Sequence, residues 1–112
     1  MKPYPAAMRE KRRYILFEVR SEKKPKASEV RRAVTDEVLS LIGSKGSAEA
    51  AYQFIDYDEK TMKGIIRVNN RGVDNAIQAL TLVREISFNK ALVHIIRVTG
   101  TVKKARELAG ER

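Results

Sequence analysis

The sequence contains no cysteine and no tryptophan, and aromatic residues make up only 6% of it. Without cysteine there can be no disulfide framework, thiolate zinc site or cysteine nucleophile, and the composition suits a reducing compartment. The apolar runs are only a few residues long, whereas a membrane-spanning helix needs about 20. No apolar segment follows the basic residues of the N-terminus, so no export signal is indicated. We therefore expect a cytoplasmic protein that does not enter a membrane.

The sequence has an excess of positive charge. Its 112 residues suffice for one domain with a single core. The 23 Lys and Arg against 14 Asp and Glu give a net charge of +9, which favours a polyanion such as RNA, DNA or an acidic membrane surface. Residues 1–32 hold 11 basic and 4 acidic side chains, residues 33–85 hold 6 and 8, and residues 86–112 hold 6 and 2. We therefore expect the two ends of the chain to bind the polyanion.

Hydrophobic periodicity predicts the elements of a small α+β domain. Ile15, Phe17 and Val19 alternate with other side chains, which is the period of a strand. Ser28 is the expected N-cap of the first helix, and Gly43 is its expected stop. The predicted order begins with a flexible basic arm at residues 1–12, a strand at 13–20 and a helix at 28–43. A hairpin of two strands at 52–57 and 62–69, a helix at 73–86, a strand at 91–99 and a basic helical tail at 101–112 follow.

This order is that of the split βαβ arrangement. We predict a ferredoxin-like sandwich, similar to an RNA recognition motif, with the order βαββαβ and a four-stranded antiparallel sheet at residues 13–100, plus a short C-terminal helix. The two main helices cover only one sheet face. Alternation places five apolar side chains on the other face, and these are Tyr14, Leu16, Ile55, Ile65 and Ile95. Such a face contacts a protein partner or a covering segment; a second subunit is favoured over the short C-terminal helix.

Residues 63–70, KGIIRVNN, begin like the main RNA-reading strand of an RNA recognition motif. The positions that need flat rings for base stacking hold Ile65, Val68 and Asn70, so stacking on the sheet is not expected. We predict phosphate contacts, which give affinity with little sequence reading. The predicted RNA-binding residues are Arg9, Lys11, Arg12, Arg13, Lys23, Lys24, Lys26, Arg31, Arg32, Lys103, Lys104 and Arg106.

No catalytic or metal-binding arrangement has a meaningful spacing. Asp56, Asp58 and Glu59 crowd one hairpin and could hold magnesium, but acidic residues are also common in polar turns, and we favour the turn. His94, the single histidine, lies among apolar neighbours and is expected to be packed and hydrogen-bonded. The glycines of residues 43–47 lack phosphate-loop spacing. We predict no catalytic residue, no metal ligand and no cofactor bound by this chain.

Four segments carry a resemblance to a known family. They read RRYILFEV, KGIIRVNN, ALTLV and RVTGTVKK, at residues 12–19, 63–70, 79–83 and 97–104. In this order and spacing they resemble the archaeal ribonuclease P protein component 2 family, which is related to a eukaryotic subunit of ribonucleases P and MRP. The resemblance spans roughly residues 9–104, and its most specific pieces are Arg13–Val19 and Gly100–Lys103.

The resemblance implies an RNA-recognition-like fold without the aromatic strand motifs. It also implies a subunit of ribonuclease P, in which a large RNA removes the 5′ leader of precursor tRNA with magnesium ions held by the RNA. The implied partner is component 3, and the pair supports the catalytic region of the RNA; a dimer of such heterodimers stays open. Our own inference is that cationic side chains offset repulsion between RNA phosphates while the apolar sheet face contacts the companion protein.

Three other functions stay open at the level of the sequence. The chain could be a stand-alone single-stranded RNA-binding domain that uses Tyr14 on its sheet. It could be a regulatory domain of the same fold that senses a small molecule, since this architecture hosts many functions. An autonomous nuclease that uses Asp56 or Asp58 is the third alternative.

Overall fold

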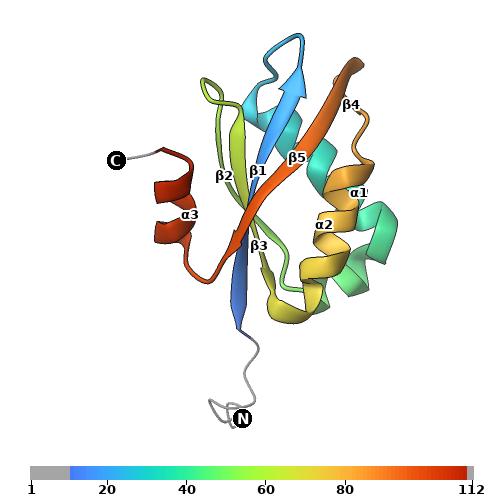
Figure 1. Cartoon of the computed structure of the whole chain (residues 1–112). Coiled ribbons are helices and arrows are strands. Elements are labelled where there is room, and N and C mark those ends of the chain that lie inside the picture. Colours follow the sequence, from blue (N-terminus) through green and yellow to red (C-terminus); the bar gives the residue numbers. More distant parts are fainter. Residues whose placement is uncertain (1–10, 111–112) are drawn as a thin grey trace, which may run out of the picture.

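The computed structural model describes residues 11–110 and has one antiparallel sheet with helices on both faces (Figure 1). The sheet order is β2-β3-β1-β5-β4, so the first strand lies in the middle. The strands are β1 (Arg12–Ser21), β2 (Gln53–Asp58), β3 (Lys63–Asn69), β4 (Glu85–Ile86) and β5 (Asn89–Thr99). The helices are α1 (Ala27–Glu49), α2 (Val73–Leu82) and α3 (Val102–Leu108), with a short 3₁₀ turn η2 at Asn70–Gly72. No helix within residues 11–110 is long and apolar enough to cross a membrane.

The main core lies between the sheet and helices α1 and α2. Alternate residues of β1 point into it, and Ile15, Phe17 and Val19 are all at most 2% exposed. Helix α1 meets them with a stripe of buried valines, and α2 adds Leu80. The period-two pattern of β1 and the helical stripe of α1 are therefore confirmed, and so is the α+β class.

The prediction of four strands is wrong by one, because Glu85–Ile86 forms the short strand β4 against Lys90 and Asn89. The predicted helix over residues 73–86 ends early for the same reason. Val83 adopts an extended backbone with φ −65° and ψ 123°, which stops α2 at Leu82. Both Val83 and Ile86 are still buried. Their apolar side chains therefore fit a helical stripe and an extended segment equally well, and periodicity could not separate the two.

Helix α1 differs from its prediction at both ends. It begins at Ala27, where the Glu29 carboxylate accepts a hydrogen bond of 2.8 Å from the backbone N–H of Lys26; Ser28 is therefore not the N-cap. Gly43 does not end the helix. It has a non-helical φ of 72° that kinks the segment, and helical structure resumes as far as Glu49. A glycine adopts this φ without steric strain, so it can mark a kink as readily as an end.

Gly64 permits the tightest packing of the sheet. It pairs with Phe17 across β3 and β1, and the Phe17 ring lies directly over it. A Cβ atom added at Gly64 would come within 2.4 Å of Phe17 Cζ. The Phe17 ring also meets Phe54 edge-on, with ring centroids 6.4 Å apart. The glycine of the KGIIRVNN segment therefore makes room for a buried aromatic ring.

Gly64→Ala is expected to destabilise the protein by about 1–3 kcal/mol, because Phe17 is enclosed and can yield only by distorting the core. The control is Gly100→Ala, since a Cβ at Gly100 would meet no described atom within 4 Å. We expect the control to change stability by less than about 0.5 kcal/mol. Urea unfolding followed by circular dichroism measures both, and equal stabilities for the two variants would contradict this account.

Candidate nucleic-acid interface

One group of predicted RNA-binding residues gathers where the two ends of the described chain meet. Tyr14 at the start of β1 pairs with Thr99 at the end of β5, so the turn into α3 lies beside the start of β1. A groove of about 550 Å³ there is lined by residues 11–14 and 100–102. Lys103 and Lys104 follow directly on the exposed side of α3. We name Lys11, Arg12, Arg13, Lys103 and Lys104 the terminal cluster.

A second group lies at the opposite end of β1, in the loop to α1 and the first turns of that helix. We name its members the loop cluster: Lys23, Lys24, Lys26, Arg31 and Arg32. Strand β1 has ten residues, and at about 3.3 Å per residue it separates the two clusters by roughly 30 Å. The predicted residues therefore form two surfaces rather than one.

All described members of both clusters are exposed except Arg13, which is half-buried. Arg9 lies outside the described residues. Arg106 is exposed on α3 and forms an ion pair with Asp56 at 3.7 Å. Exposed cations of this kind can reach phosphates without loss of buried structure, but their contact with RNA stays a prediction.

The loop cluster is held in place by backbone hydrogen bonds to the β2–β3 turn. The Ala27 N–H donates to Glu59 Oε2 at 2.8 Å, and Lys24 Nζ donates to the Lys60 carbonyl at 3.4 Å. Within the turn, Asp58 Oδ1 accepts from the Lys60 N–H at 2.8 Å. These carboxylates accept hydrogen bonds from backbone donors, which is the role of acidic residues in a polar turn. Among the described residues no group of three or more His, Cys, Asp or Glu side chains could hold a metal ion.

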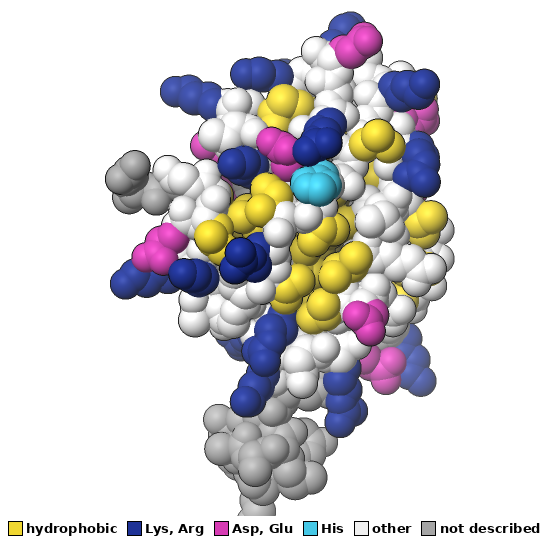
Figure 2. Space-filling view, viewed as in Figure 1, with side chains coloured by type: hydrophobic (Ala, Val, Ile, Leu, Met, Phe, Trp, Pro, Cys, Tyr) yellow, Lys and Arg dark blue, Asp and Glu magenta, His cyan; other side chains and the backbone are white. Residues whose placement is uncertain are grey.

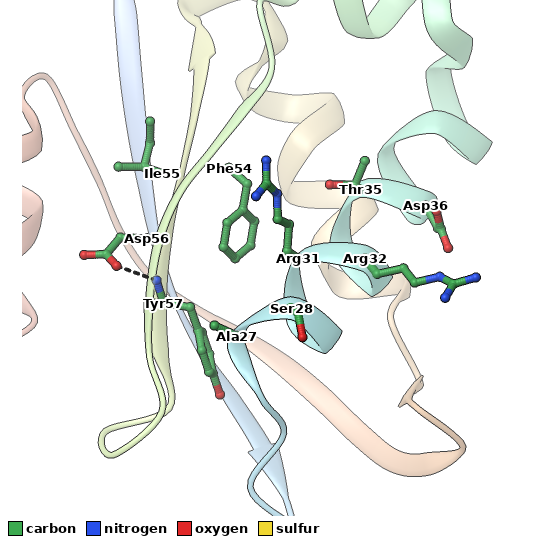
Figure 3. A pocket seen from close by; sticks show the side chains of 10 residues that line it. All are labelled: Ala27, Ser28, Arg31, Arg32, Thr35, Asp36, Phe54, Ile55, Asp56 and Tyr57. Carbon is green, nitrogen blue, oxygen red and sulfur yellow. Dashed lines mark hydrogen bonds between the residues drawn. The ribbon is translucent and has the colours of Figure 1, made fainter.

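Two of the loop-cluster arginines border a pocket of about 570 Å³ between α1 and the edge strand β2. Figure 3 shows Arg31 extended toward Phe54, whereas Arg32 points away from the sheet. Tyr57 also lines this pocket, yet its side chain is buried and no described residue hydrogen-bonds to its hydroxyl. Burial raises the pKa of Tyr57 to about 12, with Glu59 and Asp58 adding to the shift.

The opposite sheet face is partly covered by the chain's own third helix. Leu16 is 0% exposed and Ile65 is 2% exposed, because Ala105 and Ala109 of α3 pack on them. Tyr14 and Ile55 pack at the border of the same cluster. The structure supports the interpretation that the C-terminal helix covers this face. The sequence had favoured a second subunit over this helix. Leu16 and Ile65 can contact a partner protein only if α3 moves away, whereas Tyr14 and Ile55 are half-buried.

Ile95 was placed on the wrong face. A bulge interrupts the pairing of β1 with β5, so Leu16 faces Arg97 while Phe17 faces Ile95. The extra residue between them, Ile96, breaks the alternation. Ile95 consequently packs against the main core on the side of α1 and α2. A register shift of one residue moves a side chain to the other face, and a single sequence carries no marker for it.

The part of this face that α3 leaves open is formed mainly by β5 and β1. His94 lies opposite Glu18, and Leu92 lies opposite Arg20. His94, Leu92 and Arg20 are exposed, and Glu18 is half-buried. The expectation of a packed His94 is therefore wrong. Figure 2 shows the histidine, in cyan, directly above hydrophobic side chains that gather along β5 between α3 and α2.

Sequence reasoning missed a third cationic surface. A groove of about 740 Å³ lies between the end of β1 and the start of β5. Arg20, Arg84 and Lys90 line it together with Lys23 of the loop cluster. The three new residues are isolated in the sequence, each among neighbours of other types, so no local charge run marked them. The strand pairing brings them together.

Comparison with known proteins decides the family. A model of the Rpp14/Pop5 family matches residues 13–109, which include every strand and all three helices. The chain belongs to the Rpp14/Pop5 family. The family match extends through α3, so the helix that covers Leu16 and Ile65 belongs to the matched region.

Similar curated proteins carry the name ribonuclease P protein component 2. The one from Thermococcus gammatolerans is 41% identical over 91% of this chain and 85% of its own length. The one from Pyrococcus furiosus is 38% identical over 94% of this chain and 88% of its own length. The one from Saccharolobus solfataricus is 36% identical over 88% of this chain and 69% of its own length. The resemblance inferred from the four segments is confirmed.

The fold is also similar to that of a chain in the yeast ribonuclease MRP structure solved by cryo-electron microscopy. The TM-score is 0.65 at 13% identity, and the similarity covers 92% of this chain and 88% of the other. At this low sequence identity the similarity shows only that the two chains share a fold.

Ala105→Gln tests the cover over the sheet. Ala105 is fully buried against Leu16 and Ile65, so a longer polar side chain there should cost about 1–3 kcal/mol and release α3. Lys104→Gln places the same side chain at the neighbouring exposed position and should change stability by less than about 0.5 kcal/mol. Urea unfolding and proteolysis at the turn before α3 are the measurements. Equal behaviour of the two variants would show that α3 does not cover the sheet.

Tyr57→Phe is expected to raise the free energy of unfolding by about 1 kcal/mol, since it removes a buried hydroxyl that no described residue satisfies. Tyr52→Phe is the control. Its hydroxyl shares a hydrogen bond of 2.9 Å with Thr35 Oγ1, so the same change should lower stability by about 1 kcal/mol.

The pKa of Tyr57 adds a pH dependence to this comparison. The folded chain keeps the phenol proton up to about pH 12, whereas the unfolded chain releases it near about pH 10. Above the unfolded pKa the unfolded chain releases the phenol proton while the folded chain still keeps it, so the chain with Tyr57 loses stability as the pH rises toward the folded pKa. Urea unfolding between neutral pH and pH values above 10 should show the advantage of Tyr57→Phe growing. A constant difference between the two proteins would rule out a raised pKa.

Proposed function

We propose that this chain is a protein subunit of ribonuclease P that assists the catalytic RNA in removing the 5′ leader of precursor tRNA. The observation that carries the proposal is the similarity, over about nine-tenths of the chain, to archaeal proteins named ribonuclease P protein component 2. The two cationic clusters on exposed positions are consistent with an RNA partner.

The role that we propose is electrostatic. Folded RNA packs phosphates close together, and cationic side chains that approach them release bound counterions and reduce their mutual repulsion. The terminal and loop clusters lie at opposite ends of β1, so one copy can contact two separate stretches of RNA backbone. In this proposal the RNA holds the magnesium ions and carries the catalysis. The protein lowers the magnesium concentration at which the RNA keeps its active geometry.

We also propose that the chain pairs with ribonuclease P component 3 in the cytoplasm, and that such pairs can double. What supports a protein partner is the apolar surface that α3 leaves uncovered. Leu92 is 54% exposed on β5 and Ile96 is 36% exposed at the bulge. With Leu16 and Ile65 already covered, these residues replace them as candidates for the contact.

Reconstitution tests the function directly. The catalytic RNA, the component 3 protein and this chain are mixed, and precursor tRNA cleavage is followed over a magnesium titration. Omission of this chain should slow cleavage at low magnesium and matter less at high magnesium, because magnesium ions replace the cationic side chains. If omission leaves the rate unchanged at every magnesium concentration, the proposal is wrong.

Paired substitutions in that reconstituted complex test the two clusters separately. Lys103→Gln with Lys104→Gln weakens the terminal cluster, and Arg31→Gln with Arg32→Gln weakens the loop cluster. Each pair should lower the slope of log affinity for RNA against log salt by about 2, because each lost phosphate contact contributes about 1. The control is Lys45→Gln, which removes one charge from an exposed position outside both clusters. If it lowers the slope as much per charge removed as the cluster pairs do, net charge matters and the clusters do not.

A further inference from the structure

Phe88 is placed in a way that folding does not explain. Its side chain is 95% exposed, although the other two phenylalanines lie in the core or at its border. A phenylalanine that is left in water forfeits the stabilisation that burial of its ring would bring. Singly exposed apolar residues are common, so exposure alone carries no argument, and the backbone at Phe88 is the stronger sign.

The backbone at Phe88 is unfavourable for a bulky residue. Ser87 and Phe88 are the two turn residues between β4 and β5, where Ile86 pairs with Asn89. Their φ angles are 50° and 68°, a left-handed conformation that usually selects Asn-Gly in such a turn. Bulky residues rarely adopt it. Glycine at this position would make a better turn, so the ring occupies the tip against the preference of the backbone.

The base of the hairpin is held firmly, and so the ring is presented on a rigid support. Ile86 is 2% exposed in the main core. The Ala91 N–H donates to the Arg84 carbonyl at 2.9 Å, and Asn89 Nδ2 donates to the Ser87 carbonyl at 3.2 Å. A ring that is exposed on an anchored turn loses little conformational freedom when it binds something.

Positive charge surrounds the hairpin. Arg84 and Lys90 flank the turn in the sequence, and both line the groove of about 740 Å³ together with Arg20 and Lys23. One carboxylate, Glu22, lines the same groove, and Glu85 lies opposite Lys90 in the β4–β5 pair. Figure 1 shows the start of β5 and the loop after β1 at the same end of the sheet. Lys23 of the loop cluster lines the groove, so this third cationic surface adjoins the loop cluster.

We propose that Phe88 stacks on an unpaired base of RNA while Lys90 and Arg84 contact phosphates of the same strand. An exposed aromatic ring next to cationic side chains is the combination that binds single-stranded nucleic acid, because every base has a flat face and every nucleotide has a phosphate. Duplex bases are already stacked on each other, so the occupant is a loop, a bulge or a single strand. The inference rests on the proposed function in that RNA is taken to be the polyanion.

The charge around the ring favours RNA over a protein partner. Aromatic residues that anchor protein interfaces lie in the centre of well-packed patches from which water is excluded. The neighbours of Phe88 in the sequence and across the hairpin are instead polar or charged: Ser87, Asn89, Glu85 and Lys90. Base stacking is thus missing from the sheet positions Ile65, Val68 and Asn70 and is supplied at the hairpin tip.

The test uses the full chain and a short single-stranded RNA that contains 2-aminopurine, whose fluorescence is quenched when it stacks on a ring. The same RNA annealed to its complement serves as the duplex probe. Phe88→Ala should weaken binding of the single strand about tenfold and abolish the quenching, while duplex binding stays the same. Phe88→Trp keeps a ring and should retain both effects. Leu39→Ala removes an exposed aliphatic side chain from α1, outside the groove, and should leave the quenching unchanged.

Phe88→Gly separates stacking from stability. Glycine relieves the positive φ, so thermal unfolding should shift to higher temperature while single-strand binding falls as it does for Phe88→Ala. A ring with a structural role would give the opposite result, namely lower stability. Lower stability of Phe88→Gly, or unchanged binding of the single strand by Phe88→Ala, would overturn the proposal.

Two further outcomes separate this inference from the function on which it rests. If Phe88→Ala binds RNA normally but no longer associates with the component 3 protein, the ring is a protein anchor and the stacking proposal is wrong, although the subunit role stands. If Phe88→Ala cleaves precursor tRNA normally in the reconstituted complex and the terminal-cluster pair does not, the inference fails alone. If the unaltered chain binds neither RNA probe and its omission leaves cleavage unchanged, both fail.

Discussion

The central position of β1 is the constraint on which the rest of the structure depends. The strand pairs with β3 on one side and β5 on the other, so it cannot shift without breaking both ladders. Its side chains alternate between two cores: Ile15, Phe17 and Val19 face α1 and α2, and Leu16 faces α3. Because successive side chains of a strand point to opposite faces, one run of apolar residues holds helices on both sides of the sheet.

The same strand separates the charges of the molecule. The terminal cluster gathers where β1 begins, and the loop cluster starts just after β1 ends at Ser21. The rigid strand keeps these like charges roughly 30 Å apart, well beyond the screening distance of about 8 Å in physiological salt. Positive side chains can therefore accumulate at both ends with little mutual repulsion. An extended polyanion such as RNA can meet both, which is why the fold suits the scaffold role proposed for it.

The third helix changes what the sheet can do. In an open sheet of this type the face opposite the two main helices is free for a ligand, whereas here α3 covers Leu16 and Ile65. Small residues such as Ala105 and Ala109 allow the backbone at α3 to approach the sheet closely. Binding surfaces are displaced to the rim, where the strand ends, the β4–β5 hairpin and the α3 turn carry most of the cations considered above. The RNA contact proposed for Phe88 lies on this rim and not on the sheet face.

Local sequence patterns predict the α+β class, the family and the order of the elements apart from β4. Each depends on local patterns, namely period-two alternation in residues 13–19, helical spacing at Val30, Val34 and Val38, and short segments such as Gly100–Lys103 that carry the family resemblance. Only the tertiary structure decided which residues share a surface. The bulge at Ile96 reversed the face of Ile95, the cover by α3 closed over Leu16, and strand pairing joined Arg20 to Lys90 in one groove. These facts depend on contacts between residues far apart in the chain, which local pattern cannot specify.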